Sequence, residues 1–287
     1  MKLSIAVASK SAPLSAFVVW RGFEESIPKA AELGFHGIEL ALKSDDAIRK
    51  SILDRLLDKN SLEVSCISTG QVFSVSGLYF THPDKEKRKE LIETFKGFIY
   101  LAKNYGGFVN IGRARGFYSD TQTKNEVERI FIEIARVICD IAEPFEVKLL
   151  LEPVNRYETN FINTVEDGVR MLKKIKRDNI YLMPDVFHMN IEDPKIGATL
   201  AKYNFLIKYI HFADSNRMAP GKGHLDFAEI FSNLKKVSYN GWISVEILPK
   251  PDPDTAAGQA AKKLIPIIEL YNTSKDQEEF NKKYLDD

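Results

Sequence analysis

The sequence predicts a single-domain (β/α)₈ barrel, and three observations support this fold class. Eight short, strongly apolar segments recur along the chain, segments with 3.6-residue periodicity lie between them, and the length of 287 residues suits such a barrel. The first apolar segment is followed by Lys10-Ser11-Ala12-Pro13 rather than by a glycine-rich turn. A doubly wound open sheet is therefore disfavoured.

Each of the eight predicted strands is almost continuously apolar, as expected for a strand that is covered on both faces. In chain order they are residues 3–9, 37–42, 63–69, 108–112, 148–153, 180–185, 208–213 and 242–248. The alternation of these strands with helical segments is the pattern of βα units around a parallel sheet. We therefore assign one βα unit to each strand.

The intervening helices are predicted from apolar stripes. In residues 84–104 the stripe is Leu91, Phe95, Phe98 and Ala102, and in residues 125–143 it is Ile130, Ile134, Val137, Ile138 and Ile141. No proline-rich or glycine-serine linker divides the chain, so residues 1–273 are predicted to form the barrel. Residues 274–287 are mostly polar and are predicted to form an additional helix or a loosely held tail.

Composition and charge indicate a soluble protein with a small-molecule partner. Forty basic residues balance forty acidic ones, which argues against nucleic acid or a membrane surface as the partner. The apolar run after Lys2 is too short for a signal peptide, and no run of 18 apolar residues is present. Cys66 and Cys139 are predicted to be buried free thiols, which is consistent with a cytoplasmic location.

The candidate metal ligands stand at the ends of four consecutive strands. Glu152, Asp185, His211 and Glu246 each follow or interrupt an apolar run, and successive members are one βα unit apart. Strand ends of a barrel converge on one face, where the active sites of this fold are found. Such residues can also be buried polar groups held by hydrogen bonds, but a shared cation accounts better for all four.

The chemistry of the donor set indicates which ion it suits. Three carboxylates and one imidazole are an oxygen-rich set that favours Mn²⁺, with Mg²⁺ or Co²⁺ as alternatives, over a closed structural zinc site. We expect one divalent ion per chain, with Mn²⁺ as the first choice.

The sequence around these positions resembles a known family. The segments are Glu152-Pro-Val-Asn155-Arg156-Tyr-Glu158, Asp185-Val-Phe-His188, His211-Phe-Ala-Asp214-Ser-Asn216-Arg217 and Glu246. Together they are similar to the xylose-isomerase-like sugar isomerases and epimerases, specifically the D-tagatose 3-epimerase group, across the whole barrel. The resemblance implies that Glu152, Asp185, His211 and Glu246 bind one divalent metal and that Glu152 and Glu246 exchange the substrate proton. It also implies a homodimer or tetramer.

Epimerisation next to a ketone requires a base on each face of the reacting carbon, and Glu152 and Glu246 are the expected pair. The expected route passes through a cis-enediolate that the metal stabilises as a Lewis acid. His188 and Arg217 are predicted to hydrogen-bond the oxyanion, although His188 can instead cap or pack its loop and Arg217 can form a surface ion pair. The resemblance suggests that Glu158 holds a hydroxyl on the next substrate carbon.

Several further polar residues are assigned secondary roles. Asn155, Arg156, Asp214 and Asn216 are expected to orient ligands or fix loop backbone. Glu39, at the end of the second strand, is a further site candidate, and His224 either lines the pocket or lies outside it. His36 and His82 are expected to be structural or exposed.

Two loops bear on the substrate. Thr69-Gly70-Gln71-Val-Phe73 and Ile111-Gly112-Arg113-Ala-Arg115-Gly116 resemble the subgroup that acts on keto-sugar acids and converts 5-keto-L-gluconate to D-tagaturonate. Gln71, Arg113 and Arg115 are therefore predicted to bind substrate, the arginines through its carboxylate. The arginines can instead pair with surface acids. A neutral substrate, with D-tagatose or D-psicose 3-epimerase activity, is the alternative.

Other classes fit less well. Aldose–ketose isomerases that shift hydride use two metals and a lysine, and only one complete ligand set is present here. Endonuclease IV-like hydrolases need three zinc ions and many histidines, whereas this chain has 5 histidines and no net charge. A non-catalytic sugar-binding protein would have no use for two facing glutamates.

Overall fold

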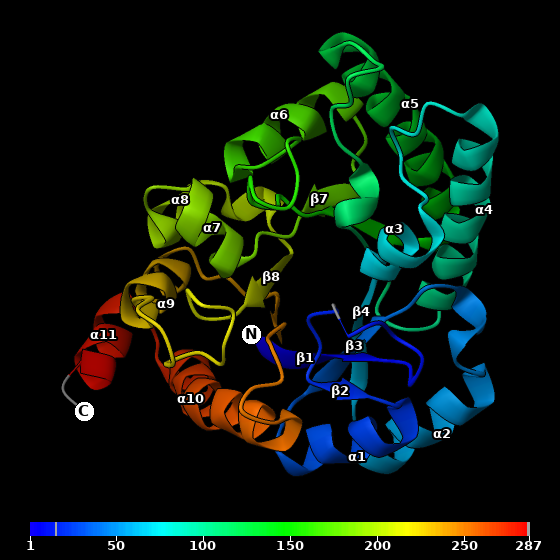
Figure 1. Ribbon diagram of the computed structural model, residues 1–287. Helices are drawn as coiled ribbons and strands as arrows, with labels where there is room; N and C mark the ends of the chain where they lie inside the picture. Colours follow the sequence, from blue (N-terminus) through cyan, green and yellow to red (C-terminus); the bar gives the residue numbers. More distant parts are fainter. Residues whose placement is uncertain (15, 286–287) are drawn as a thin grey trace.

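The computed structural model of the protein describes residues 1–14 and 16–285 and shows a ring of parallel strands surrounded by helices (Figure 1). The strand order around the ring is β7-β6-β5-β4-β3-β1-β9-β8, and a short strand, β2, pairs with β1 beside this path. The strands are β1 Lys2–Ala8, β2 Trp20–Arg21, β3 Gly37–Ala41, β4 Glu63–Ser68, β5 Phe108–Ile111, β6 Lys148–Leu151, β7 Ile180–Leu182, β8 Tyr209–Phe212 and β9 Trp242–Val245. The predicted (β/α)₈ barrel is confirmed.

The ring closes between β7 and β8, and this junction differs from the others. Most other neighbouring strands pair in parallel ladders, such as β5 with β6 from Phe108 to Ile111, although β4 and β5 share a single pair, Ile67 with Val109. Between β7 and β8 the described residues form two isolated bridges, Leu182 with Ile207 and Asp185 with His211. The backbone N–H of His211 also donates to the carbonyl of Pro184 at 2.9 Å. We refer to this junction as the β7–β8 seam.

The described ranges contain eleven α-helices, and the longer ones surround the ring of strands (Figure 1). They are α1 Phe23–Glu32, α2 Lys50–Asn60, α3 Gly70–Ser76, α4 Lys85–Ala102, α5 Lys124–Ala142, α6 Val165–Ile175, α7 Val186–Glu192, α8 Ile196–Lys202, α9 Phe227–Lys236, α10 Pro253–Thr273 and α11 Gln277–Leu285. The helices α5 and α6 begin at capping boxes, in which the Thr123 and Thr164 side chains accept from the backbone N–H three residues later.

The two predicted apolar stripes have different outcomes. In α4 the expected residues Leu91, Phe95, Phe98 and Ala102 are buried, so that stripe is confirmed. The buried face of α5 is instead Val127, Phe131, Ala135, Ile138, Cys139 and Ala142, and Val137 is 41% exposed. Phe131 sets this orientation, because its ring packs between those of Phe80 and Phe161, with centroids 5.6 and 5.4 Å away.

The end of the described chain is helical. Phe280 in α11 is fully buried, and its ring lies 5.8 Å from Tyr271 of α10 and 5.4 Å from Tyr284. Asp286 and Asp287 of the predicted tail lie outside the described residues. Among the helices described, none is both long and apolar enough to cross a membrane. Cys66 and Cys139 are free and buried, as predicted.

Burial makes Asp193, which follows α7, a pH-dependent weak point of the fold. Burial raises the pKa of Asp193 to about 6. A carboxyl with a raised pKa destabilises the folded state once it ionises. The loss of stability therefore develops as the pH rises from about 4, the pKa of an aspartate in the unfolded chain, to about 6.

We therefore expect Asp193→Asn to increase the free energy of unfolding at pH 7 by about 1 kcal/mol, a value reduced for the partial exposure of the side chain. At pH 3.5 the two proteins should have nearly equal stability, because the carboxyl is then neutral in the folded state. Urea unfolding at both pH values measures the difference. A gain of the same size at both would contradict the assignment.

Candidate metal centre and reaction cavity

The four predicted ligands meet at one end of the barrel. Glu152 directly follows β6, Asp185 caps α7 after β7, His211 lies in β8 and Glu246 directly follows β9. One ligand atom from each lies within 4.8 Å of the other three. Glu152, Asp185 and His211 are buried, and Glu246 is partly buried. The structure therefore brings the predicted set together.

The charges in this cluster fit a divalent cation. Burial raises the pKa of Glu246 to about 8, and the neighbouring Glu152 and Asp185 carboxylates add to the rise while His211 and Arg217 oppose it. Three carboxylates crowded in a buried site are unfavourable unless positive charge balances them. The donor set of three carboxylates and one imidazole is also the kind that Mn²⁺ and Mg²⁺ accept. We conclude that the residues present fit such an ion.

Arg217 supplies positive charge beside the cluster. Its guanidinium is ion-paired with both Asp185 and Glu246 and lies 4.8 Å from the ring centroids of Phe17 and Phe187. Burial lowers the pKa of Arg217, but the carboxylates outweigh burial and the net pKa is raised. The predicted alternative, a surface ion pair, does not describe this buried side chain.

The loop that carries Arg217 holds it in an uncommon backbone conformation. Arg217 has a φ of 63°, in the left-handed region that non-glycine residues rarely adopt. Its N–H donates to the carbonyl of Asp214 at 2.9 Å, and its own carbonyl accepts from Leu248 at 2.9 Å. The Asp214 carboxylate in turn accepts from the N–H groups of Ser215, Gly221 and Leu225. As expected from the sequence, Asp214 fixes loop backbone.

His188 presents a defined hydrogen-bond donor to the cavity. The backbone N–H of Tyr157 donates to Asn155 Oδ1 at 2.9 Å, which leaves the Asn155 amide Nδ2 to donate to His188 Nδ1 at 2.7 Å. The proton of the neutral ring therefore lies on Nε2, which is 3.8 Å from Asp185 Oδ2. Burial, followed by the nearby Arg217, lowers the pKa of His188 and keeps the ring neutral.

We expect Asn155→Asp to disturb this donor, because a carboxylate cannot donate to Nδ1 and instead draws the proton there. His188 would then turn its unprotonated Nε2 to the cavity or become charged. The turnover number should fall by about tenfold or more, as for the loss of one oriented donor, while KM changes less. Asn155→Ser, which restores a donor at shorter reach, should retain more activity than Asn155→Asp. Equal kinetics for Asn155→Asp and the parent protein would contradict the role.

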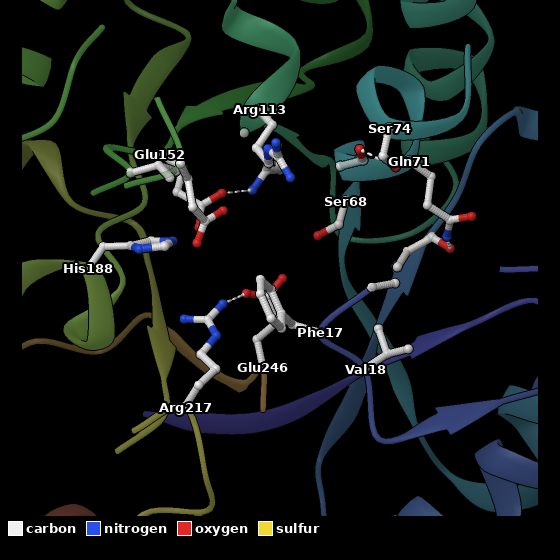
Figure 2. A pocket seen from close by; sticks show the side chains of 17 residues that line it. Phe17, Val18, Ser68, Gln71, Ser74, Arg113, Glu152, His188, Arg217 and Glu246 are labelled. Carbon is white, nitrogen blue, oxygen red and sulfur yellow. Dashed lines mark hydrogen bonds and ion pairs between the residues drawn. The ribbon is translucent and has the colours of Figure 1, made fainter. Parts of the chain in front are cut away.

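A cavity beside the four predicted ligands is lined by residues from several strand ends (Figure 2). Glu152, His188 and Arg217 border it on one side, and Ser68 and Gln71 border it on the other. Phe17 and Val18, from the loop after β1, and Glu158 complete the wall. Burial raises the pKa of Glu158, although Arg217 and Arg113 oppose the rise.

Two amide side chains that line the cavity each keep one acceptor atom without a hydrogen bond among the described residues. Gln71 Nε2 donates to the carbonyl of Ala41 at 2.7 Å, and Asn110 Nδ2 donates to Glu152 Oε2 at 3.0 Å. Their carbonyl oxygens are buried and have no hydrogen-bond partner among the residues described. Gln71 was a predicted site residue, whereas Asn110 was missed. Its signal was a single polar residue inside the apolar strand 108–112.

The structure separates the two predicted arginines. Arg113 lines the cavity and stacks over Phe73, with 5.1 Å from its guanidinium carbon to the ring centroid. Arg115 is not among the residues that line the cavity. It is fully buried and donates only to backbone carbonyls, those of Gly112, Glu152, Phe161 and Ile162. This geometry departs from the expectation that Arg115 binds substrate, because four of its five N–H donors hold the backbone around Glu152.

The remaining singled-out residues lie outside the cavity wall. His36 Nδ1 accepts from the N–H of Leu3, and His82 Nδ1 accepts from that of Asp84. His224 pairs with Ser215 in the 214–225 loop. Arg156 forms an ion pair with Glu192 at 2.7 Å, and Asn216 donates to the carbonyl of Lys222.

Comparisons of sequence and structure find known proteins that are similar to this chain. Residues 27–267 match the family model of the xylose isomerase-like TIM barrels. The L-ribulose 3-epimerase of Mesorhizobium japonicum is 29% identical over 230 residues, covering 78% of this chain and 74% of that protein. The D-psicose 3-epimerase of Ruminiclostridium cellulolyticum is 35% identical over a stretch that spans 40% of this chain and 39% of that relative. The solved structure of D-allulose 3-epimerase from Methylomonas sp. has a TM-score of 0.78 at 24% identity, with 93% and 97% of the two chains covered.

Proposed function

This chain belongs to the family of xylose isomerase-like TIM barrels, and we propose that it is a metal-dependent sugar epimerase that inverts the carbon next to the carbonyl of a ketose or keto-sugar acid. The observation that carries the proposal is the position of Glu152 and Glu246. They follow different strands, border one cavity and both approach His211, whose Nδ1 lies 3.2 Å from Glu152 Oε1 and 3.7 Å from Glu246 Oε2. The related sugar 3-epimerases support the same reaction class.

The proposed reaction moves one proton off the substrate and another onto it. One glutamate takes the proton from the C–H next to the carbonyl, and the electron pair moves onto the carbonyl oxygen to give an enediolate. The other glutamate returns a proton to the opposite face, and the carbonyl reforms with that carbon inverted. Glu152 and Glu246 exchange these roles when the reaction runs backwards.

Glu152, Asp185, His211 and Glu246 would hold the ion, for which we propose Mn²⁺ with Mg²⁺ or Co²⁺ as alternatives. When bound, the ion supplies a Lewis acid that acidifies the C–H next to the carbonyl. The His188 Nε2–H and the Arg217 guanidinium stabilise negative charge on the substrate oxygens. Glu158 and Gln71, which both line the cavity, accept hydrogen bonds from substrate hydroxyls.

A screen in D₂O tests the proposal. Ketoses and keto-hexonates are incubated with the protein and Mn²⁺, and the expected result is an epimer that carries deuterium at the carbon next to the carbonyl. Inversion without deuterium incorporation would contradict proton exchange with solvent-accessible bases. Aldose formation without epimer would instead indicate an aldose–ketose isomerase.

We propose further that the substrate is a keto-sugar acid, with 5-keto-L-gluconate to D-tagaturonate as the specific candidate. Arg113 supports this, because its exposed guanidinium lines the cavity and makes no ion pair with the described residues. A guanidinium binds a carboxylate through two parallel hydrogen bonds, whereas a neutral ketose needs only hydroxyl partners. A neutral ketose, D-tagatose or D-psicose, is the second candidate, favoured by the named 3-epimerase relatives.

Arg113→Ala should lower kcat/KM for a keto-hexonate by about 2 kcal/mol, or roughly 30-fold, and leave the matching neutral ketose nearly unchanged. Arg156→Ala is the matched control, because it removes an equal charge beside a hollow that Arg113 also lines, from a side chain already paired with Glu192. Arg115→Ala should instead lower the melting temperature, since four carbonyls lose their donor. Equal effects of Arg113→Ala on both substrates would favour the neutral ketose.

A further inference from the structure

We propose that Glu39 is a positioning residue for the metal site: it holds the Nε2–H of His211 and so directs Nδ1 of that ring toward the ion. The inference rests on the proposed metal centre. It adds a fifth residue, from strand β3 on the far side of the ring, that does not itself contact the ion.

The two nitrogens of His211 face different partners. Nε2 lies 3.0 Å from both carboxylate oxygens of Glu39. Nδ1 lies on the side of the ligand cluster, 3.2 Å from Glu152 Oε1 and 3.7 Å from Glu246 Oε2. Two of the other three ligands therefore lie on the Nδ1 side, and Nδ1 is the nitrogen available to the ion.

The proton of a neutral His211 must then reside on Nε2. A carboxylate can only accept hydrogen bonds, and both Glu39 oxygens face Nε2. A metal-ligating histidine commonly donates its second N–H to a carboxylate, which fixes the ring and makes the ligating nitrogen more basic. The opposite tautomer would place a proton on Nδ1 and exclude the ion.

A network of hydroxyl groups holds Glu39 in this orientation. Tyr209 donates to Glu39 Oε2 at 2.9 Å, and Ser68 donates to Oε1. The Tyr209 hydroxyl also lies 2.7 Å from Ser65 Oγ and 3.0 Å from Ser4 Oγ. These side chains come from β1, β4 and β8, so the position of Glu39 is fixed by three strands besides its own.

The location of Glu39 indicates a role beyond packing. Its side chain is fully buried inside the barrel, a layer that bulky aliphatic residues usually fill. A buried carboxylate is costly unless charged or hydrogen-bonding partners compensate it. His211 is the basic side chain paired with it among the residues described. The hydrogen bonds that orient the His211 ring account for the free-energy cost of burying the Glu39 carboxylate.

Mn²⁺ titration tests the proposal, with the free ion followed by electron paramagnetic resonance. Glu39→Gln should weaken Mn²⁺ binding by about 10- to 100-fold relative to the wild type, because the uncharged amide no longer favours the Nε2–H tautomer. Ser65→Ala is the matched control. It alters the same buried network through Tyr209 but does not contact His211, and its affinity should stay within about twofold of the wild type.

The outcomes separate this inference from the proposed function. Equal Mn²⁺ affinity of Glu39→Gln and the wild type, or an equal loss in Ser65→Ala, would overturn the role of Glu39 while leaving the metal site intact. A wild type that binds no Mn²⁺ would overturn the metal site itself.

A second measurement does not depend on how the variant folds. Nitrogen-15 NMR of histidine-labelled wild type saturated with diamagnetic Mg²⁺ should show the His211 proton on Nε2. A proton on Nδ1 would overturn the proposal even if Glu39→Gln failed to fold.

Discussion

Replacing either Glu152 or Glu246 by glutamine should reduce epimerisation by at least about 1,000-fold, the scale of a lost general base. Each substitution removes the proton carrier on one face of the substrate carbon and also weakens the proposed ligand set. The amide keeps the size of the side chain, so the barrel should remain folded. Circular dichroism and the melting temperature check this.

The two variants should also differ in isotope exchange. When one base remains, the substrate proton on that face can still exchange with D₂O, whereas inversion requires both. We therefore expect residual deuterium incorporation without epimer for one substrate epimer in each variant, and for opposite epimers in the two variants. Turnover near the wild-type rate by either protein would show that the two-glutamate mechanism is wrong.

Removal of divalent metal should abolish activity as completely as these substitutions. After chelation and dialysis the protein should be inactive, and added Mn²⁺ should restore the rate at about one ion per chain. Elemental analysis together with the initial rate measures both quantities. A chelated protein that keeps its full rate would contradict the metal dependence, and two or three tightly held zinc ions per chain would favour an isomerase or a nuclease instead.

Much of the fold was predictable because parallel strands buried on both faces are nearly continuous apolar runs. All eight strands of the ring were located in this way, for example 148–153 against the observed Lys148–Leu151. The orientation of α5 was not predictable, because its isoleucines form a plausible stripe of their own. Only the packing of Phe131 against rings from two distant segments selects the face that is buried.

The candidate site was predictable where position on a strand determines direction. Glu152, Asp185, His211 and Glu246 stand at strand ends, and strand ends of a barrel converge. Arg113 and Arg115 lie in one short turn, where two residues of separation turn one side chain to the cavity and the other to buried carbonyls. The part played by Glu39 depends on a contact between β3 and β8, which are far apart in the sequence.

The β7–β8 seam gives the ligand set a consequence for the lifetime of the protein. Asp185 and His211 form one of the two isolated bridges across this seam, so two of the four ligands stand on opposite sides of a junction that has no continuous ladder. An ion bound by both residues would stabilise the β7–β8 seam and slow hydrogen exchange at the amides of β7 and β8. A chain without the ion would lack this link, and opening at the seam would expose the facing edges of β7 and β8, which favour aggregation. The supply of the ion would thus affect the lifetime of the folded protein as well as its catalytic rate.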